Sequence, residues 1–242
     1  MTTIKQCLIL AAGNGTRLRA VSHELPKPLV EFQGRPILEH VIRSAQEASI
    51  EEFVIVLGYR GALIRNWFEN SYKGSARFSW VENPDYHKSN GVSALKARQA
   101  LYDNFLLLMA DHIFEPRTAT MMVRQHLAAG EVILAVDPKI DRVFDLDDAT
   151  KVRRIGDRIV DIGKEIAKYD ALDTGMFLCT PSLFDDLERA SKYGNCSLSD
   201  GMRRVIRRGC LHAREIGDAE WHDLDTPEAL AHADSESLLY AA

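Results

Sequence analysis

The 242-residue sequence predicts an α/β fold with a mixed, mostly parallel central sheet flanked by helices. Two observations lead to this prediction. Apolar runs of strand length alternate with helically periodic segments through the first half, and the second half adds strands that include a hairpin. The composition, 46% hydrophobic and 27% charged, excludes disordered, collagenous and coiled-coil classes. We expect a single domain over residues 1–242, because no linker, low-complexity tract or repeat divides the chain.

The first half of the chain has the pattern of successive βαβ units, which build a parallel sheet. The run from Phe105 to Met109 is strongly apolar and is expected to be a buried strand. The predicted strands are 4–10, 53–57, 78–81 and 105–109, and the predicted helices are 36–49, 61–69, 92–101 and 118–129.

After residue 130 the regular alternation stops. A turn at Gly156-Asp157 separates two short apolar runs and indicates a hairpin. We therefore expect a mixed sheet that carries an inserted part. The predicted strands here are 132–136, 151–155, 159–162, 175–179 and 211–216, and the predicted helices are 182–190, 198–208 and 227–239.

Charge and hydropathy exclude several classes of function. Lys and Arg number 30 against 35 Asp and Glu, and the net charge of −5 argues against nucleic acid as the main partner. A basic cluster with helical spacing, Arg203, Arg204, Arg207 and Arg208, is interpreted as a solvated helix face. The N-terminus lacks the pattern of an export signal, and every apolar run is far shorter than the roughly 18 residues that a membrane helix needs. We expect a cytoplasmic protein with no membrane span.

Neither the cysteines nor the histidines have the spacing of a known metal motif. His87, His112 and His222 lie in no HExxH pattern. The cysteines form no CxxC pair, so we expect reduced thiols, mostly in the core. They are Cys7, Cys179, Cys196 and Cys210.

The stretch after the first strand carries the strongest chemical signal. The glycines of Gly13-Asn14-Gly15 let a ligand approach the backbone, where successive N–H groups can face phosphate oxygens. Arg17 offers a fork of donors for phosphate, and Lys27 is an ammonium held between Pro26 and Pro28. The alternative is a tight turn with two surface cations.

Two common phosphate motifs do not fit this stretch. Leu18 stands where the dinucleotide fingerprint needs its third glycine, and no GxxxxGK[ST] sequence occurs. A nicotinamide-dependent oxidoreductase could use Glu31 as its acidic residue, but it leaves Lys27 and Asp111 unexplained. A non-catalytic nucleotide-binding protein would need the two glycines but neither of those charged residues.

Segments 10–18 and 26–30 together resemble the signature of the sugar-phosphate nucleotidyltransferases. The resemblance implies a Rossmann-like nucleotidyltransferase fold that joins a nucleoside triphosphate to a phosphorylated acceptor. It also implies that Arg17 and Lys27 act as catalytic residues at the reacting phosphates. The nucleotide-binding residues that it implies in the loop are Leu10, Ala11, Ala12, Gly13, Asn14, Gly15 and Thr16.

Further motifs follow in order, and they are similar to those of the CTP:inositol-1-phosphate cytidylyltransferases. The similarity to phosphocholine and phosphonate cytidylyltransferases is weaker. Some such relatives carry a fused membrane synthase, so we expect any second step to belong to a separate membrane protein. The motifs are Ser89-Asn90-Gly91-Val92-Ser93-Ala94-Leu95, Met109-Ala110-Asp111-His112, Asp161-Ile162-Gly163-Lys164, Asp173-Thr174-Gly175 and the segment 221–227.

This similarity implies transfer from CTP to inositol 1-phosphate, giving CDP-inositol and pyrophosphate. Phosphocholine, a phosphonate or a sugar 1-phosphate is the alternative acceptor. Residues 1–130 would form the nucleotide-binding half and residues 131–242 the acceptor-binding half. The implied roles are nucleotide binding by Asn90, Gly91 and Ser93, acceptor binding by Lys164, Asp173, Thr174 and Gly175, and Mg²⁺ binding by Asp111 and Asp225.

The residues themselves leave alternatives for the two aspartates. Asp111 follows the apolar strand, at the end where open α/β sheets bind ligands, and its carboxylate suits Mg²⁺. It could equally be a turn or cap residue. Asp225 and Glu228 fit a capping box, although Thr226 could cap the same helix and leave Asp225 for a metal.

The other candidate residues also have ordinary structural explanations. Asn90 and Gly91 could form a turn and helix cap, although an amide also suits a pyrimidine edge. Without the resemblance, Lys164 would be interpreted as an ordinary solvent-exposed lysine. The acidic run 145–148 could bind cations but is interpreted as a solvated loop.

Overall fold

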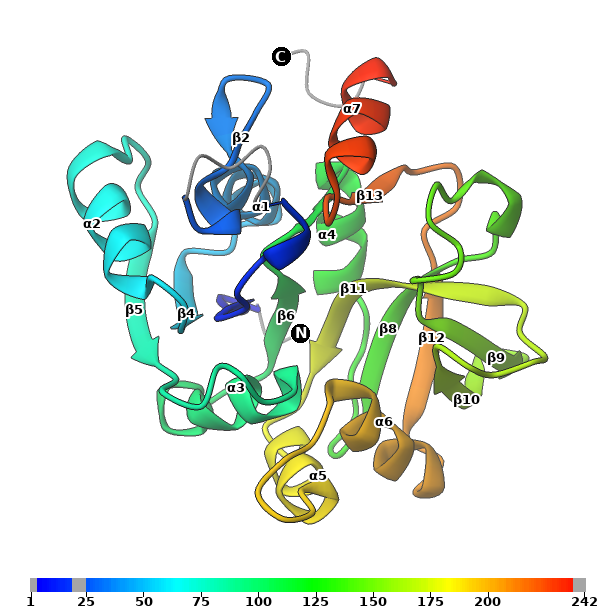
Figure 1. Ribbon diagram of the computed structural model, residues 1–242. Coiled ribbons are helices and arrows are strands. Elements are labelled where there is room, and N and C mark those ends of the chain that lie inside the picture. Colours follow the sequence, from blue (N-terminus) through cyan, green and yellow to red (C-terminus); the bar gives the residue numbers. More distant parts are fainter. Residues whose placement is uncertain (1–3, 19–24, 237–242) are drawn as a thin grey trace.

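The computed structural model describes residues 4–18 and 25–236. Its centre is a nine-stranded sheet with the strand order β5-β4-β1-β6-β11-β8-β12-β10-β9 (Figure 1). The predicted α/β fold with a mixed sheet is therefore confirmed. The strands are β1 (Gln6–Ala11), β4 (Glu52–Leu57), β5 (Arg77–Glu82), β6 (Phe105–Met109), β8 (Val132–Asp137), β9 (Lys151–Ile155), β10 (Arg158–Gly163), β11 (Ala171–Cys179) and β12 (Leu211–Glu215).

Strand direction divides the sheet into two regions. β5, β4, β1 and β6 are all parallel, as the βαβ pattern of the first half predicts. β11 is antiparallel to both β6 and β8, whereas β12 is parallel to β8. β9 and β10 form the predicted antiparallel hairpin. The mixed pairing therefore begins where β11 joins the parallel strands.

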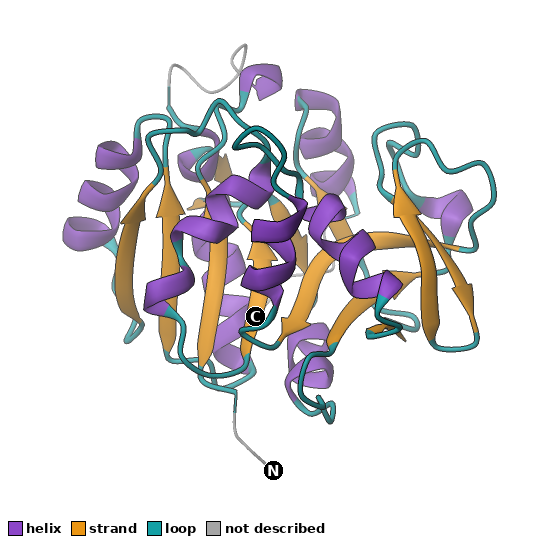
Figure 2. Ribbon diagram, turned by 90° about the horizontal axis from the view of Figure 1, so that it is seen from below, coloured by secondary structure: helices purple, strands orange, loops and turns teal. Residues whose placement is uncertain are grey.

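Helices cover both faces of this sheet (Figure 2). Alternate residues of β1 point to opposite faces, so Cys7 and Ile9 join one core cluster while Leu8 and Leu10 join another. The first cluster contains residues of α1, α2 and α4, and the second contains residues of α3, α5 and α6. The helices are α1 (Ile37–Glu47), α2 (Gly61–Ser71), α3 (Asn90–Lys96), α4 (Pro116–Val123), α5 (Leu183–Ala190), α6 (Leu198–Arg207) and α7 (Pro227–Ser235).

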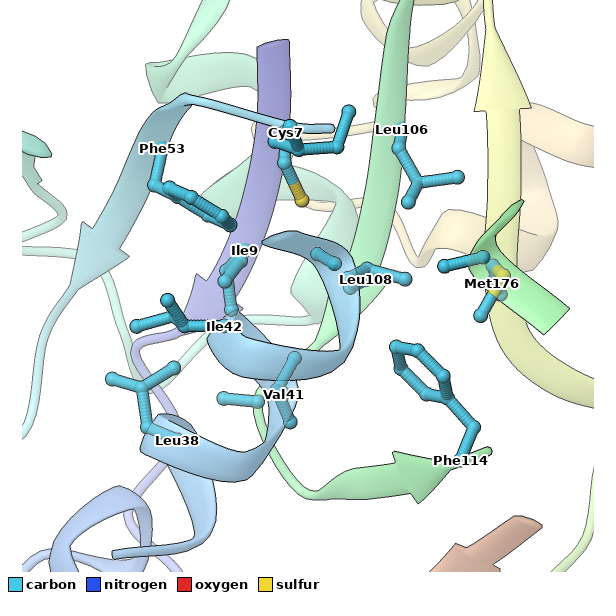
Figure 3. Packing of buried hydrophobic residues seen from close by; sticks show 14 of the residues in the cluster. Cys7, Ile9, Leu38, Val41, Ile42, Phe53, Leu106, Leu108, Phe114 and Met176 are labelled. Atoms are coloured by element: carbon cyan, nitrogen blue, oxygen red, sulfur yellow. The ribbon is translucent and has the colours of Figure 1, made fainter. Parts of the chain in front are cut away.

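The packing of α1 shows what holds these layers together. Its apolar residues recur on one helical face, and Figure 3 shows Leu38, Val41 and Ile42 close to Ile9 and Leu108 of the sheet. All five side chains are at most 1% exposed. Each such burial contributes about 1.5–3 kcal/mol of hydrophobic stabilisation. This packing fixes the sheet edge from which the loops after β1 and β6 emerge.

Several predicted boundaries differ from the structure. The helix predicted at 92–101 begins at Asn90 and continues beyond Lys96 only as a 3₁₀ turn, and the helix predicted at 118–129 ends at Val123. Residues 237–239 of the last predicted helix lie outside the described residues. Two three-residue strands, β7 (His112–Phe114) and β13 (Trp221–Asp223), pair with each other and were not predicted. Such short strands are missed because three residues are too few to show an alternation of apolar and polar side chains.

The remaining structural expectations can be compared directly. Cys7, Cys179 and Cys196 are free and buried, and Cys210 is free and half-buried, as expected. Within the described part of the chain, no helix is both long and apolar enough to cross a membrane.

Candidate active site

Two adjoining cavities lie at the carboxyl ends of β1 and β6. These strands are parallel neighbours, so the loops that follow them meet at one sheet edge. The glycine-loop cavity is lined by Leu10, Ala11, Gly13, Asn14, Gly15, Thr16, Arg17, Lys27, Pro28, Ala110, Asp111 and Asp225. The wide cavity shares Arg17, Asp111 and Asp225 and extends past His112, Asp148, Lys164, Asp173 and Asp223. The predicted phosphate loop, lysine and aspartates are therefore together in space.

The glycine loop is shaped for close approach. A Cβ on Gly13 would meet nothing within 4 Å, so the backbone there is open to a ligand. Gly15 has a φ of +55°, and a Cβ on it would lie 2.7 Å from Cβ of Lys27. Gly15 therefore lets the loop pass directly over the lysine, which brings the loop backbone and the ammonium to one place.

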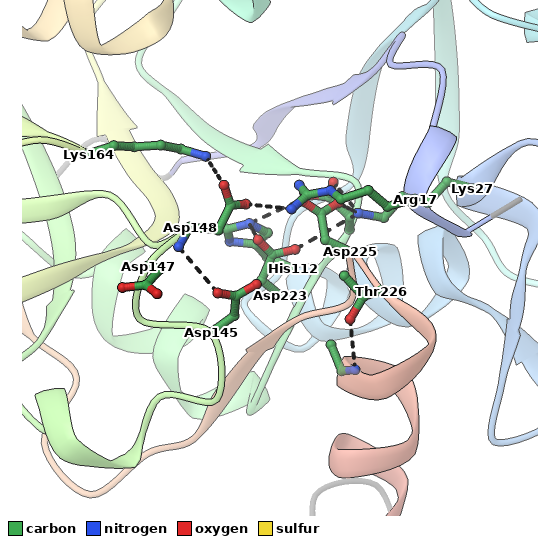
Figure 4. Close-up of polar contacts among 12 residues, drawn as sticks. Arg17, Lys27, His112, Asp145, Asp147, Asp148, Lys164, Asp223, Asp225 and Thr226 are labelled. Atoms are coloured by element: carbon green, nitrogen blue, oxygen red, sulfur yellow. Dashed lines mark hydrogen bonds and ion pairs between the residues drawn. The ribbon is translucent and has the colours of Figure 1, made fainter.

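Lys27 is a buried cation surrounded by carboxylates (Figure 4). Only 6% of its side chain is exposed, and its Nζ donates a hydrogen bond of 2.7 Å to Asp111. It also hydrogen-bonds to Asp225, and its Nζ lies 3.9 Å from Asp223. The fixed φ angles of Pro26 and Pro28 restrict the backbone on both sides. The proline-flanked lysine thus presents one rigid positive charge to three carboxylates.

Asp225 could cap α7 or could face the site, and the position of Thr226 distinguishes the two. Oγ1 of Thr226 accepts a hydrogen bond of 3.1 Å from the backbone N–H of Ala229 and caps α7 (Figure 4). Asp225 instead hydrogen-bonds to both Lys27 and Arg17. The capping box with Glu228 does not form, because Thr226 occupies the cap position and Ala229 the third helical position.

His112 and Asp111 are electrostatically linked. Nδ1 of His112 donates to the carbonyl of Thr174 at 2.9 Å, and Nε2 lies 3.4 Å from Asp223. Burial opposes the charged imidazole, but Asp223 and Asp111 outweigh it and raise the pKa of His112 to about 9. Burial likewise opposes the Asp111 carboxylate, but the charges of Lys27 and His112 lower its pKa to about 2. At neutral pH the site therefore holds interleaved positive and negative charges.

The carboxylates have the chemistry of a site for a hard cation. Oδ1 of Asp111 and Oδ1 of Asp223 are buried and have no hydrogen-bond partner among the described residues. Carboxylate oxygens of Asp148, Asp223 and Asp225 lie within 4.8 Å of one another. Oxygen donors of this kind suit Mg²⁺. Asp223 was missed from the sequence, although the alternation His222-Asp223-Leu224-Asp225 puts two acids at a two-residue interval.

The acidic run 145–148 is more than the solvated loop that the sequence predicted. Asp148 hydrogen-bonds to Arg17 at 2.9 Å and also to Lys164 (Figure 4). Burial opposes ionisation of Asp148, but these two cations lower its pKa. The ammonium of Lys151 donates to the carbonyl of Asp147 at 3.1 Å and holds the loop inward. One loop carboxylate thereby joins the glycine loop to the β9–β10 hairpin region.

Most of the predicted acceptor residues line the wide cavity. Lys164, Asp173 and Gly175 do so. Burial raises the pKa of Asp173 to about 6, although the hydrogen bond from the Gly175 N–H and the charge of His112 act to lower it. Thr174 does not line the wide cavity. Successive residues of β11 face opposite ways, so the Thr174 hydroxyl is buried and donates to the carbonyl of Ala135 at 2.9 Å. We correct the prediction for Thr174 accordingly: its carbonyl orients His112, and its side chain faces the core.

Four predicted nucleotide-binding residues either make structural contacts or lie outside both cavities. Asn90 lines the wide cavity, but its Oδ1 accepts a hydrogen bond of 2.8 Å from the N–H of Leu198 at the start of α6. A Cβ on Gly91 would lie 2.7 Å from the Cys196 carbonyl, so this glycine permits close packing of α3. Ser93 is 5% exposed and lines neither cavity, as is also true of Ala12, which is 3% exposed.

Comparisons with known proteins agree with this geometry. The model of the MobA-like NTP transferase domain matches residues 7–213. The chain belongs to this family. It is 35% identical over 97% of its length to the bifunctional IPC transferase and DIPP synthase of Rubrobacter xylanophilus, and 30% identical over 95% to that of Aquifex aeolicus. It covers 52% and 51% of these proteins, so the chain spans about half the length of the curated relatives it matches.

Solved structures give the same result. The inositol-1-phosphate CTP transferase from T. maritima superposes with a TM-score of 0.83 and 26% identity, covering 98% of each chain. A UDP-glucose pyrophosphorylase complexed with UDP-glucose has a TM-score of 0.82 at 21% identity, covering 96% of this chain and 98% of its own. The second match supports the fold alone. The predicted nucleotidyltransferase family and fold are therefore confirmed.

Proposed function

We propose that this chain transfers a cytidylyl group from CTP to inositol 1-phosphate and releases pyrophosphate. The observation that carries the proposal is the meeting of Arg17 and Lys27 with Asp111 and Asp225 where the two cavities join. The similarity to the inositol-1-phosphate CTP transferase from T. maritima supports inositol 1-phosphate and CTP as the substrates. We further propose that the chain works in the cytoplasm and that a membrane synthase consumes its product.

The reaction needs no general base. A phosphate monoester has a second pKa of about 6, so the acceptor is already largely a dianion at neutral pH. One of its oxygens attacks the α-phosphorus of CTP, and the bond from that phosphorus to the pyrophosphate oxygen breaks. The barrier comes from repulsion between anions and from charge on the leaving pyrophosphate. Positive charges lower this barrier: Arg17 stabilises the leaving phosphates, Lys27 the reacting centre, and Lys164 the acceptor phosphate.

Asp111, Asp223 and Asp225 would hold Mg²⁺, which when bound supplies positive charge to the α-phosphate and the leaving group. The buried Oδ1 atoms of Asp111 and Asp223, which form no hydrogen bond with the described residues, support this assignment. Asp111 and Asp225 also pair with Lys27, and Asp225 pairs with Arg17. The two basic side chains are thus kept near the phosphate positions before substrate arrives.

Polar groups around the wide cavity suit a polyol. Asp173 has a pKa raised to about 6 by burial, so near neutral pH its carboxyl group can accept, or when protonated donate, a hydrogen bond to a hydroxyl. The Lys164 ammonium is half-exposed beside it in the cavity lining and can meet the acceptor phosphate. A quaternary ammonium would instead require a cage of aromatic faces.

The test measures pyrophosphate release by the full chain with each nucleoside triphosphate, with and without Mg²⁺. We expect release with CTP and inositol 1-phosphate only when Mg²⁺ is present. In competition for limiting CTP, inositol 1-phosphate should exceed phosphocholine in kcat/KM by at least tenfold, about 1.4 kcal/mol. Preference for phosphocholine or a hexose 1-phosphate would overturn the acceptor assignment. No pyrophosphate with any pair of substrates would overturn nucleotidyl transfer itself.

A further inference from the structure

A second cluster of ligating side chains lies beside the carboxylate site and takes no part in the proposed reaction. It consists of His222 on β13, His232 on α7 and Glu236 at the end of α7. The His222 side chain is only 10% exposed, and its Nε2 has no hydrogen-bond partner among the described residues. A buried imidazole nitrogen without a hydrogen bond is costly unless something else occupies it.

The distances within this cluster fit a tetrahedral metal ion. Oε2 of Glu236 lies 3.7 Å from Nε2 of His222 and 3.6 Å from Nε2 of His232. One possible ligand atom from each of the three residues lies within 4.8 Å of the other two. A tetrahedral zinc ion with bonds of about 2.0–2.1 Å separates its ligand atoms by about 3.4 Å. The Glu236 oxygen therefore needs to approach each imidazole nitrogen by only a few tenths of an ångström.

The backbone holds the three ligands in place. His222 is the central residue of β13 and is in register with Ile113 of β7. The N–H of Glu236 donates to the carbonyl of His232 at 3.2 Å, which sets the two side chains one helical turn apart. Phe144 stacks on the His232 ring with centroids 4.7 Å apart. The cluster therefore touches β13, α7 and the loop that carries Asp148.

We propose that His222, His232 and Glu236 bind a zinc ion, with a fourth position left for water. Two imidazoles and a carboxylate favour zinc over Mg²⁺, which prefers oxygen ligands alone. His222 and Asp223 are adjacent in β13 and so point to opposite faces of the strand. The zinc position is therefore distinct from the carboxylate cluster. Bound zinc would fasten α7 to the strand that leads directly into Asp223 and Asp225.

The test uses the untagged full chain, stripped of metal with a chelator and then titrated with Zn²⁺ against a coloured zinc indicator. A large excess of Mg²⁺ is present throughout to occupy the carboxylate cluster. We expect one zinc per chain and a melting temperature that rises with zinc. His232→Ala and Glu236→Gln should each weaken binding at least about 100-fold, since loss of even an outer-shell partner costs about 10–100-fold. The control His126→Ala removes an exposed histidine beyond α4 and should leave zinc affinity unchanged.

Replacement of zinc by cobalt gives an independent readout. The visible spectrum of the cobalt protein should be that of a four-coordinate tetrahedral ion and should be lost in His232→Ala. Equal zinc affinity in the parent and in both cluster variants would overturn the proposal, as would an octahedral cobalt spectrum. Binding that disappears when Mg²⁺ is added would place the ion at the carboxylates and would also overturn it. None of these outcomes depends on whether nucleotidyl transfer occurs.

Discussion

The two cavities of the candidate site are built in different ways. The glycine-loop cavity takes most of its lining from one continuous segment, 10–17. Lys27 and Asp111 contribute to the rest of the lining. The wide cavity draws its lining from segments as far apart in sequence as Arg17 and Ala229. The first is therefore shaped largely by local backbone conformation, and the second by contacts between distant segments.

This difference has an energetic consequence. Lys27 is almost fully buried against carboxylates, where an unpaired charge is expensive. In the wide cavity, Lys164 is 50% exposed and Arg17 is 47% exposed, and Asp148 joins them through pairs that solvent screens. The buried pairs of Lys27 should thus be sensitive to any change of charge, whereas the exposed pairs of Asp148 should tolerate one.

The largest effect is expected for Lys27→Ala. It removes the buried cation at the reacting phosphates and should lower kcat by roughly 10³, measured as pyrophosphate release. It also leaves Asp111 and Asp225 without their cation, so the melting temperature should fall in metal-free buffer. Mg²⁺ should restore much of that loss by taking the place of the lysine charge. A variant with unchanged melting in metal-free buffer would show that the pairs in the glycine-loop cavity are energetically unimportant.

Asp111→Asn should have the next largest effect. Asparagine keeps the size of the side chain but loses the charge that would hold Mg²⁺, so kcat should fall by on the order of 10². The control is the metal requirement itself, since chelation should abolish the activity of the parent protein. Near-normal turnover of the variant at saturating Mg²⁺ would mean that Asp111 only supports the turn after β6.

The same contrast explains what could be predicted from the sequence. Residues 10–17 and Lys27 were predicted because a continuous motif brings its chemistry with it. Asp148 was interpreted as part of a solvated loop, because its partner Arg17 lies 131 positions away and no local pattern encodes that contact. Asp223 was missed because it lies on a three-residue strand that has no detectable period. The side chain of Thr174 was assigned to the wrong face because the start of β11 was predicted four residues too late. Thr174 then lay outside the predicted strand, so the alternation of side chains could not place it.

Asp148→Asn tests the exposed charge pairs of the wide cavity. Substrate phosphates must displace Asp148 from Arg17 and Lys164, and an exposed pair is worth about 0.2–1 kcal/mol. The variant should therefore lower the KM of CTP and of the acceptor by about two- to fivefold, with little change in kcat. Steady-state kinetics at varied concentrations of each substrate measures both constants. A fall in kcat as large as that of Asp111→Asn would instead make Asp148 a metal ligand.

The smallest effect on activity is expected for Thr226→Ala, the neighbour of Asp225. Loss of its cap on α7 should cost about 1 kcal/mol of the free energy of unfolding, because the Ala229 N–H loses its acceptor. Turnover should change less than about twofold, since Asp225 keeps its contacts with Lys27 and Arg17. Asp225→Asn is the matched variant: it leaves the threonine cap in place but removes a carboxylate from the site. We expect that variant to lose activity while α7 stays capped. The reverse pattern, with Thr226→Ala inactive and Asp225→Asn active, would return Asp225 to a purely structural role.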